Sequence, residues 1–222
     1  MNTEQLCKQL DDLDPAAFCD ADKTIRVVAP DIGRINPGRK LVGPARTVRC
    51  FDDFLTIIEA LDQSVRGDVL VIDTQGSTRA VVGELFSLEA HRRGLAGIVI
   101  DGGCRDTETL AELDMPVYAR HRTPVSGTVQ DLTETQVSII CGGVTVQPGD
   151  IVFGDADGVV VMSVQEVEAL LPQAQQIKNT EQQAIAAMAA GRSLIELTNF
   201  KQHAAAVRRG DKESRLSFTI DD

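Results

Sequence analysis

Two short apolar runs, with a helical segment between them, most constrain how this chain can fold. Residues 68–73 (DVLVID) and 95–100 (LAGIVI) are rich in branched aliphatic side chains, which is typical of strands buried on both faces. Residues 80–93 (AVVGELFSLEAHRR) carry a helical pattern that stops at Gly94, where a helix commonly places glycine. A strand, a helix and a second strand in this order predict a parallel, right-handed crossover.

The second half of the chain predicts a second layer of β-structure. Glycines and prolines divide it into short branched segments, for which we expect strands over residues 137–140, 144–146, 151–153 and 159–162. Residues 164–190 then follow a helical pattern that Pro172 is expected to kink or divide. A short surface helix is expected over residues 3–14, and the tail after Gly191 is polar.

Length and charge limit the organisation and the partners. With 222 residues and 43% hydrophobic content, the chain is expected to form one domain, with a core over about residues 20–165 and a C-terminal helix and tail over 164–222. Its net charge of −11 disfavours nucleic acid and anionic membranes as partners. An anionic substrate therefore needs a local positive group or a metal ion.

The five cysteines are scattered, without the spacing of a zinc site, which fits reduced thiols. The N-terminus lacks a basic segment followed by an apolar one, and no run is long enough to cross a bilayer. We therefore expect a cytoplasmic protein.

Charged residues gather where the predicted parallel strands end. Asp73 and Asp101 close the two apolar runs, and Arg105-Asp106 follow in the next loop. Open α/β sheets bind ligands at this carboxyl edge. Arg105 can bind an oxo or enolate oxygen, and Asp106 offers a hard oxygen ligand for Mg²⁺ or Mn²⁺.

The segment from Gly83 to Phe86 begins the crossover helix. Unpaired amides in the first turn, at Glu84, Leu85 and Phe86, could bind a carboxylate. The alternative is that Glu84 merely favours a helix start and that Arg105-Asp106 is a solvated surface pair. Spacing alone leaves both interpretations open.

Glu181 gives a separate indication, because it falls on an apolar stripe of the C-terminal helix. A carboxylate in that position either reaches solvent at the edge of the helix or pairs with a charged group. In the second case Glu181 would join the outer shell of a metal site, in its own subunit or in a neighbour.

Other features have structural explanations. Asp155-Ala-Asp157-Gly158 lacks the remaining ligands of a calcium loop and predicts a tight turn. Cys104 has no histidine partner that would indicate a nucleophile. No lysine lies between Lys40 and Lys178, which disfavours a Schiff-base aldolase. Three neighbouring residues are candidates for binding the far end of a substrate: Arg120, His121 and Arg122.

The segment GELFSLEAHRRGLAGIVIDGGCRD, with GPARTVRC before it and GGVTVQPGDIVFGDADGVVV after it, resembles the RraA-like family. The likeness runs from about residue 42 to 162. Its most specific element is an acidic residue, twenty intervening residues and Arg-Asp, here Glu84 and Arg105-Asp106. In the family this spacing separates aldolases from inhibitors of ribonuclease E.

The resemblance implies a single-domain α/β fold, a layered α/β/β/α sandwich that assembles into homotrimers or hexamers. It implies that Asp106 is the direct metal ligand, that Glu84 acts through water, and that Arg105 contacts the substrate oxo group. Gly83 and the amides of Leu85 and Phe86 would bind the pyruvate carboxylate. Glu181 corresponds in position to a glutamate that acts through water from the adjacent subunit.

The implied activity is that of a class II aldolase dependent on Mg²⁺ or Mn²⁺. Its substrates would be small 2-oxo acids such as 4-hydroxy-4-methyl-2-oxoglutarate or 4-carboxy-4-hydroxy-2-oxoadipate, cleaved to pyruvate, and it would also decarboxylate oxaloacetate. The alternative is a non-catalytic regulator of ribonuclease E. A quinone-precursor methyltransferase is a third hypothesis, for which the sequence contains no glycine-rich nucleotide loop.

Overall fold

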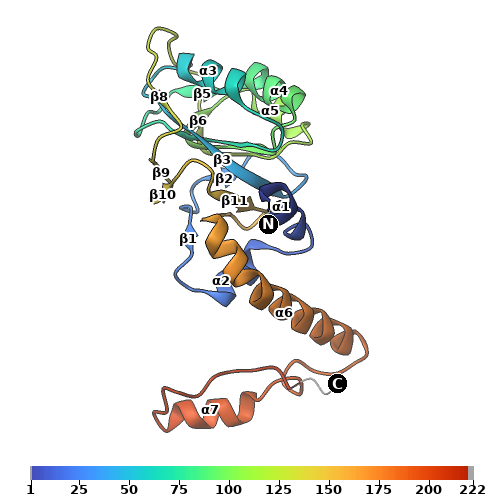
Figure 1. Ribbon diagram of the computed structural model, residues 1–222. Coiled ribbons are helices and arrows are strands. Elements are labelled where there is room, and N and C mark those ends of the chain that lie inside the picture. The colour runs from blue at the N-terminus through green and yellow to red at the C-terminus, as the bar shows by residue number, and fades with distance from the viewer. Residues whose placement is uncertain (1, 220–222) are drawn as a thin grey trace. The chain divides into compact units, whose positions relative to one another are not determined.

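The computed structural model describes residues 2–219, which form a mixed α/β fold (Figure 1). The helices are α1 (Thr3–Gln9), α2 (Pro15–Ala21), α3 (Leu55–Gln63), α4 (Glu84–Arg93), α5 (Thr107–Ala111), α6 (Val164–Ala189) and α7 (Phe200–Arg208). The strands are β1 (Arg26–Val27), β2 (Gly33–Arg34), β3 (Leu41–Arg49), β4 (Val69–Asp73), β5 (Ala80–Val82), β6 (Gly97–Cys104), β7 (Val117–Arg122), β8 (Glu134–Thr135), β9 (Ile139–Cys141), β10 (Val144–Val146), β11 (Ile151–Gly154) and β12 (Val159–Met162).

Strand β3 joins two parts of one sheet whose order is β1-β12-β11-β3-β4-β6-β7-β2, with β5 beside β6 and β8 beside β3. Its first half, Leu41 to Pro44, pairs antiparallel with β11, and its second half, Ala45 to Arg49, pairs parallel with β4. Because the two halves of β3 have different partners, the sheet curls at this strand. The β11–β12 hairpin then forms a second layer against β4 and β6, as Val71 and Val161 share one buried cluster.

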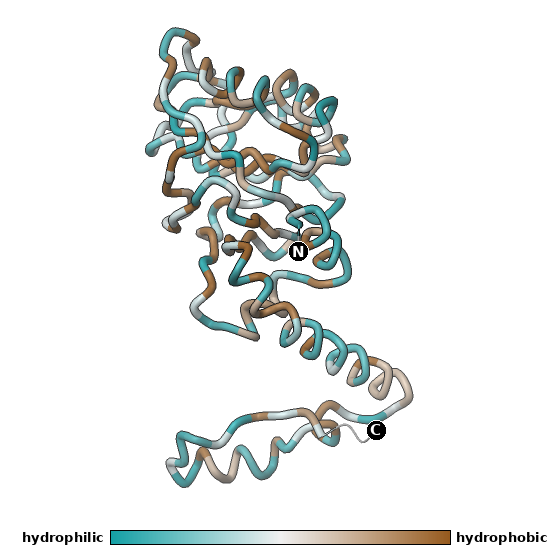
Figure 2. Tube along the Cα trace, in the orientation of Figure 1, coloured by the Kyte–Doolittle hydropathy of each residue, from teal (hydrophilic) through white to brown (hydrophobic). Residues whose placement is uncertain are grey.

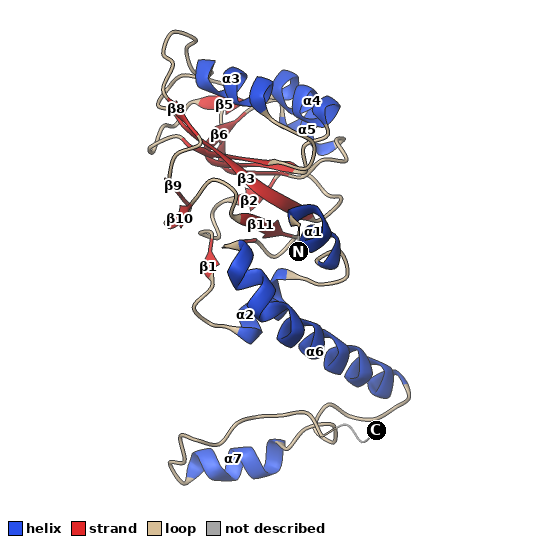
Figure 3. Cartoon of the chain, viewed as in Figure 1, coloured by secondary structure: helices blue, strands red, loops and turns tan. Residues whose placement is uncertain are grey.

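Alternating side chains on the central strands create the layers. Leu70 and Ile72 of β4 belong to the buried cluster that includes residues of α3, α4 and α5. Val69 and Val71 of the same strand point to the opposite face and join β11 and β12. Figure 3 shows α3, α4 and α5 together over one face of the sheet.

A further helical layer covers the β11–β12 hairpin. Phe18 of α2 meets Phe153 of β11 edge to face, with ring centroids 5.9 Å apart. Leu6 and Leu10, also in the N-terminal part of the chain, are fully buried. The order helix, sheet, sheet, helix is the layered α/β/β/α class expected from the sequence. Burial of these residues extends the core further toward the N-terminus than residue 20.

The predicted helix over residues 80–93 is wrong at its start. Ala80 to Val82 form the buried strand β5, which pairs parallel with β6, and the helix begins only at Glu84. The strand is stabilised on its other side, where Ala80 N donates to Val125 O (2.8 Å) and Gly127 N donates to Ala80 O (2.9 Å). The helix ends as predicted, with Gly94 in the left-handed region at φ 78°.

The structure shortens the predicted N-terminal helix, shows no division at Pro172 and confirms the predicted turn at Asp155. The helix over residues 3–14 is shorter, Thr3–Gln9, with an asparagine capping box at its start. Pro172 does not divide the C-terminal helix, because α6 runs without a break from Val164 to Ala189. Proline has no backbone N–H, so the helix lacks one hydrogen bond at this position. The turn at Asp155 is confirmed by a hydrogen bond from Asp157 N to Asp155 Oδ1 (2.9 Å).

The chain divides into two compact units, Met1–Leu171 and Pro172–Asp222. In the second unit, α7 is followed by a segment that returns to form an isolated bridge between Thr198 and Phe218. The single-domain organisation expected from the sequence stays a prediction.

Hydrophobic residues follow the strands of the sheet, whereas hydrophobic and hydrophilic residues alternate along α6 (Figure 2). This pattern is that of a sheet buried on both faces and of an amphipathic helix. Within residues 2–219, no helix combines the length and the apolar character needed to cross a membrane.

Gly97 offers a test of how closely the sheet is packed. A Cβ atom on Gly97 would lie 2.4 Å from Leu41 Cδ1 and 2.6 Å from Pro116 O, so Gly97→Ala is expected to cost about 1–3 kcal/mol in free energy of unfolding. Gly33→Ala is the matched control, since no atom lies within 4 Å of its added Cβ, and should change stability by less than about 0.5 kcal/mol. Urea denaturation of the two variants measures both values, and equal stabilities would contradict the packing.

Candidate active site

The first turn of α4 presents backbone donors to a pocket. Gly83 precedes the helix in an extended conformation and provides no capping side chain. Glu84 N donates to Asp106 Oδ2 at 3.1 Å, which leaves the amides of Leu85 and Phe86 as the unpaired donors of this turn in the described chain. A helix start with free amides binds anions through its N–H groups and the positive end of its dipole.

Arg105 and Asp106 reach this helix because the chain leaves β6 beside β5. Arg105 N donates to Val82 O at 3.0 Å, which holds the pair one residue from Gly83. Asp106 adopts the left-handed conformation (φ 55°, ψ 37°), an unfavourable state for a residue with a Cβ atom. Its Oδ2 atom then lies 3.4 Å from Arg105 Nε as well as within reach of the α4 amide. The carboxylate is therefore oriented from two sides.

Gly83 permits this close approach. A Cβ atom on Gly83 would lie 2.4 Å from Asp106 Oδ2 and 2.9 Å from Arg105 Cγ. Any larger residue at this position displaces the Arg105-Asp106 pair. A glycine is thus required here by contact with the two charged side chains, and its φ of −150° is one that other residues also adopt.

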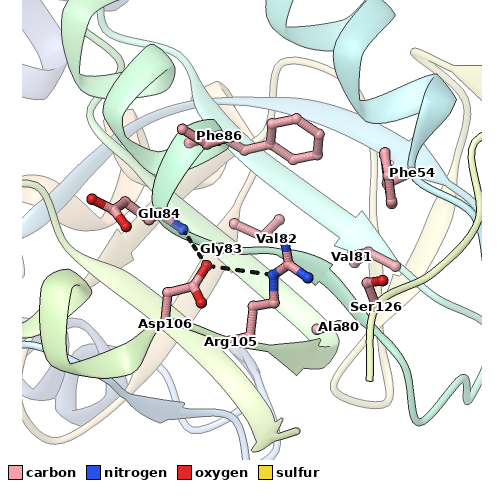
Figure 4. A pocket seen from close by; sticks show the side chains of 11 residues that line it. Phe54, Ala80, Val81, Val82, Gly83, Glu84, Phe86, Arg105, Asp106 and Ser126 are labelled. Carbon is pink, nitrogen blue, oxygen red and sulfur yellow. Dashed lines mark hydrogen bonds and ion pairs between the residues drawn. The ribbon is translucent and has the colours of Figure 1, made fainter. Parts of the chain in front are cut away.

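These groups surround a small pocket (Figure 4). Its volume is about 150 Å³, less than the roughly 300–1,000 Å³ of sites for drug-sized ligands, and so suits a small ligand. Its wall opposite the charged pair is apolar, with the rings of Phe54 and Phe86 packed edge to face at 5.5 Å. The lining consists of Phe54, Ala80, Val81, Val82, Gly83, Glu84, Leu85, Phe86, Arg105, Asp106 and Ser126.

The structure brings together six of the seven site residues predicted from the sequence, namely those of the Gly83–Phe86 segment and the Arg105-Asp106 pair. The seventh, Glu181, belongs to the other compact unit, where Lys178 Nζ lies 3.7 Å from its carboxylate. Sequence reasoning missed Phe54 and Ser126. The turn residues Pro124 and Gly127 mark a loop around Ser126, but no sequence signal connects that loop or Phe54 to the site.

A second hollow, of about 380 Å³, is also lined by Arg105 and Asp106. Of the three candidates for a distal contact, only Arg122 lines it. Arg120 is engaged in ion pairs with Asp31 and with Asp101, the latter at 2.5 Å. The Nε2 atom of the third candidate, His121, is buried without a hydrogen-bond partner in the described chain.

The carboxylates of the pocket suit a hard divalent cation. Mg²⁺ is commonly bound in proteins by one or two carboxylates, with water and substrate oxygens completing its coordination. Asp106 and Glu84 provide two such carboxylates on one pocket. No group of three or more histidine, cysteine, aspartate or glutamate side chains that could hold a metal occurs among residues 2–219.

Cys104 precedes the charged pair but has the properties of a core residue. Its side chain is fully buried, and desolvation by burial raises the pKa of its thiol to about 11. The nearby positive charge of Arg122 opposes this shift without cancelling it. Because the thiolate is the reactive form, Cys104 is not suited to act as a nucleophile at neutral pH.

Cys104 should consequently resist alkylation in the native protein. A thiol with a pKa of about 11 instead of 9.0 has about 100-fold less thiolate below pH 9, and burial slows the reaction further. Iodoacetamide at pH 8, followed by peptide mass mapping, should label Cys104 only after unfolding. Cys19, which is partly exposed, is the internal control and should react first. Rapid native labelling of Cys104 would contradict its assignment to the core.

Comparison with known proteins places this chain in a family. The chain matches the RraA-like model, described as Aldolase/RraA, over residues 15–161, and it belongs to the RraA-like family. A relative from Halalkalibacterium halodurans, provisionally named 4-hydroxy-4-methyl-2-oxoglutarate aldolase, is 38% identical over 142 residues, which are 63% of this chain and 68% of the relative.

Two solved structures support the same placement. An uncharacterized protein from Pseudomonas syringae pv. tomato is similar with a TM-score of 0.78 and 30% identity, covering 87% of this chain and 96% of the other. The RNA-processing inhibitor RraA from Thermus thermophilis is similar with a TM-score of 0.63 and 28% identity, covering 67% and 91%. The family thus includes proteins named as an aldolase and as an inhibitor.

Proposed function

We propose that this protein is a class II aldolase, dependent on Mg²⁺ or Mn²⁺, that cleaves 4-hydroxy-2-oxo acids to pyruvate and also decarboxylates oxaloacetate. The observation that carries the proposal is the meeting of Asp106 with the first turn of α4, through the 3.1 Å bond from Glu84 N. It brings the Arg105 guanidinium, the anion-binding start of α4 and the side chains of Glu84 and Asp106 to one small pocket. The name of the relative from Halalkalibacterium halodurans supports the substrate class.

Substrate binding would use the two faces of the pocket. The carboxylate of the 2-oxo acid would accept hydrogen bonds from the amides of Leu85 and Phe86, which have no partner in the described chain. The Arg105 guanidinium, which points into the pocket in Figure 4, would donate to the oxo group. Both contacts orient the acid beside Asp106.

Asp106 would hold the divalent cation directly, and Glu84, with Glu181 from an adjacent subunit of a trimer or hexamer, would do so through water. The bound cation would act as a Lewis acid on the carbonyl oxygen of the substrate. Orientation of the Asp106 carboxylate by the α4 amide and by Arg105 prepares this binding in the free protein.

Carbon–carbon cleavage needs stabilisation of an enolate. The C3–C4 bond breaks, its electron pair forms the C2–C3 double bond of the enolate, and the oxo oxygen takes the negative charge, while the C4 hydroxyl becomes a carbonyl and gives its proton to water, which can return a proton to C3. Arg105 stabilises the oxygen that gains charge, and the apolar wall of Phe54 and Phe86 strengthens that interaction by excluding water. Protonation of C3 gives pyruvate. Oxaloacetate forms the same enolate when it loses CO₂.

The first test is the release of pyruvate from 4-hydroxy-4-methyl-2-oxoglutarate and from oxaloacetate. EDTA should abolish both activities and added Mg²⁺ should restore them, while Asp106→Ala should lower kcat/KM by about 100-fold or more. Asp114→Ala, which removes an exposed carboxylate paired with Arg39, is the control and should keep full activity.

Activity that survives both EDTA and Asp106→Ala would overturn the proposed mechanism. Absence of pyruvate release from either substrate, together with tight binding to ribonuclease E, would favour the regulator, which the likeness to the Thermus thermophilis inhibitor also makes a candidate. Asp106→Ala should leave such binding unchanged.

Gly83→Ala should separate the site from the fold. The added Cβ displaces Asp106 Oδ2 and the Arg105 side chain, so kcat/KM is expected to fall by about 100-fold. Because Gly83 has φ −150°, which alanine also adopts, the melting temperature should change little. Gly33→Ala is the control for activity. An active Gly83→Ala enzyme would show that the 2.4 Å approach is not needed for catalysis.

A further inference from the structure

The Arg105-Asp106 pair lines two hollows, and the second of them also contains the basic side chain of Arg122. The first hollow contains the start of α4, whereas the second is lined by Arg122 with Thr107 and Thr123. A ligand held at Arg105-Asp106 therefore meets both hollows. The first hollow has a volume of only about 150 Å³, and the second, with about 380 Å³, offers room for the part of a longer ligand that the first does not hold.

Backbone pairing fixes where Arg122 lies. It is the last residue of β7 and is in register with Cys104 of β6, the residue before Arg105. The next hydrogen bond along the strands, from Thr123 N to Cys104 O at 3.0 Å, continues the pairing past Arg122. The side chains of Arg105 and Arg122 consequently extend from the ends of adjacent strands, at the same edge of the sheet.

Arg122 also differs from its neighbours in having no protein partner. Arg120, two residues earlier, is neutralised by Asp101 and Asp31, and Arg105 is paired with Asp106. In the described part of the chain, the Arg122 guanidinium forms no hydrogen bond and no ion pair. In a protein of net charge −11, an unpaired arginine that lines a hollow provides a local site for an anion.

The geometry points to Arg122 as the residue that binds a second carboxylate of the substrate, on the fragment beyond the bond that breaks. This inference rests on the proposed function and names the residue that would bind the far carboxylate of its substrates. The threonine hydroxyls of the same hollow offer further donors to that carboxylate. Arg122 acts in specificity, and the bond cleavage itself takes place at Arg105 and Asp106.

A matched pair of uncleavable acids tests the inference without requiring turnover. 2-Oxoglutarate and 2-oxopentanoate have the same chain length, but only the first carries a distal carboxylate. Titration calorimetry in Mg²⁺ should show that Arg122→Ala weakens 2-oxoglutarate binding by about 10- to 100-fold, the range for a charged hydrogen bond, and changes 2-oxopentanoate binding by less than about 2-fold. Arg122→Lys should recover part of the loss.

Arg39→Ala is the control, because it removes the same charge from a different surface hollow and should leave both affinities unchanged. Equal effects of Arg122→Ala on the two acids, no effect on either, or the same effect from Arg39→Ala would each overturn the role of Arg122. If wild-type protein binds neither acid in Mg²⁺, the proposed 2-oxo acid site fails as well. If wild-type protein binds both acids and Arg122→Ala changes the two affinities equally, the proposed function stands and only this inference is refuted.

Discussion

The hydrogen bond from Arg105 N to Val82 O, 3.0 Å long, is the contact on which the site depends. It forms where β5 lies parallel to β6 with a register shift, so that the strand end that carries Arg105 meets the residue before Gly83. Backbone pairing thereby sets the distance between the charged pair and α4. The side chains complete the arrangement, with glycine at position 83 and a left-handed backbone at Asp106 allowing the final approach.

Local patterns were enough to predict the central layers. The runs of branched aliphatic residues predicted β4 and β6, and the position of Gly94 predicted the end of α4. The start of that helix was missed because Ala80 to Val82 are apolar and precede it directly, a pattern that suits a buried helix or a buried strand equally. The strand is favoured by hydrogen bonds to residues 125–127, a contact over some 45 residues that no local pattern records.

The same distinction applies to the site. Glu84 and Arg105-Asp106 could be found from the sequence because Glu84 lies at the start of the crossover helix and Arg105-Asp106 follows a strand that ends at the carboxyl edge of the sheet. Phe54 could not, because its place in the pocket depends on packing against Phe86 across the fold. Likewise, Arg120 and Arg122 were equivalent as sequence candidates, and only the position of Asp31 and Asp101 shows that one arginine is already paired.

The charges around the pair also limit which substrates the site can bind. At physiological ionic strength, charges more than about 8 Å apart in solvent are largely screened, so the charged groups that line the hollows contribute most to the field that a ligand meets there. There Arg105 and Arg122 are balanced by Glu84 and Asp106, and the four side chains together are neutral. A divalent cation would leave an excess of two positive charges, which a dicarboxylate neutralises and a monocarboxylate does not. Binding of the cation and preference for a second carboxylate would therefore be coupled, because each depends on the same local balance of charge.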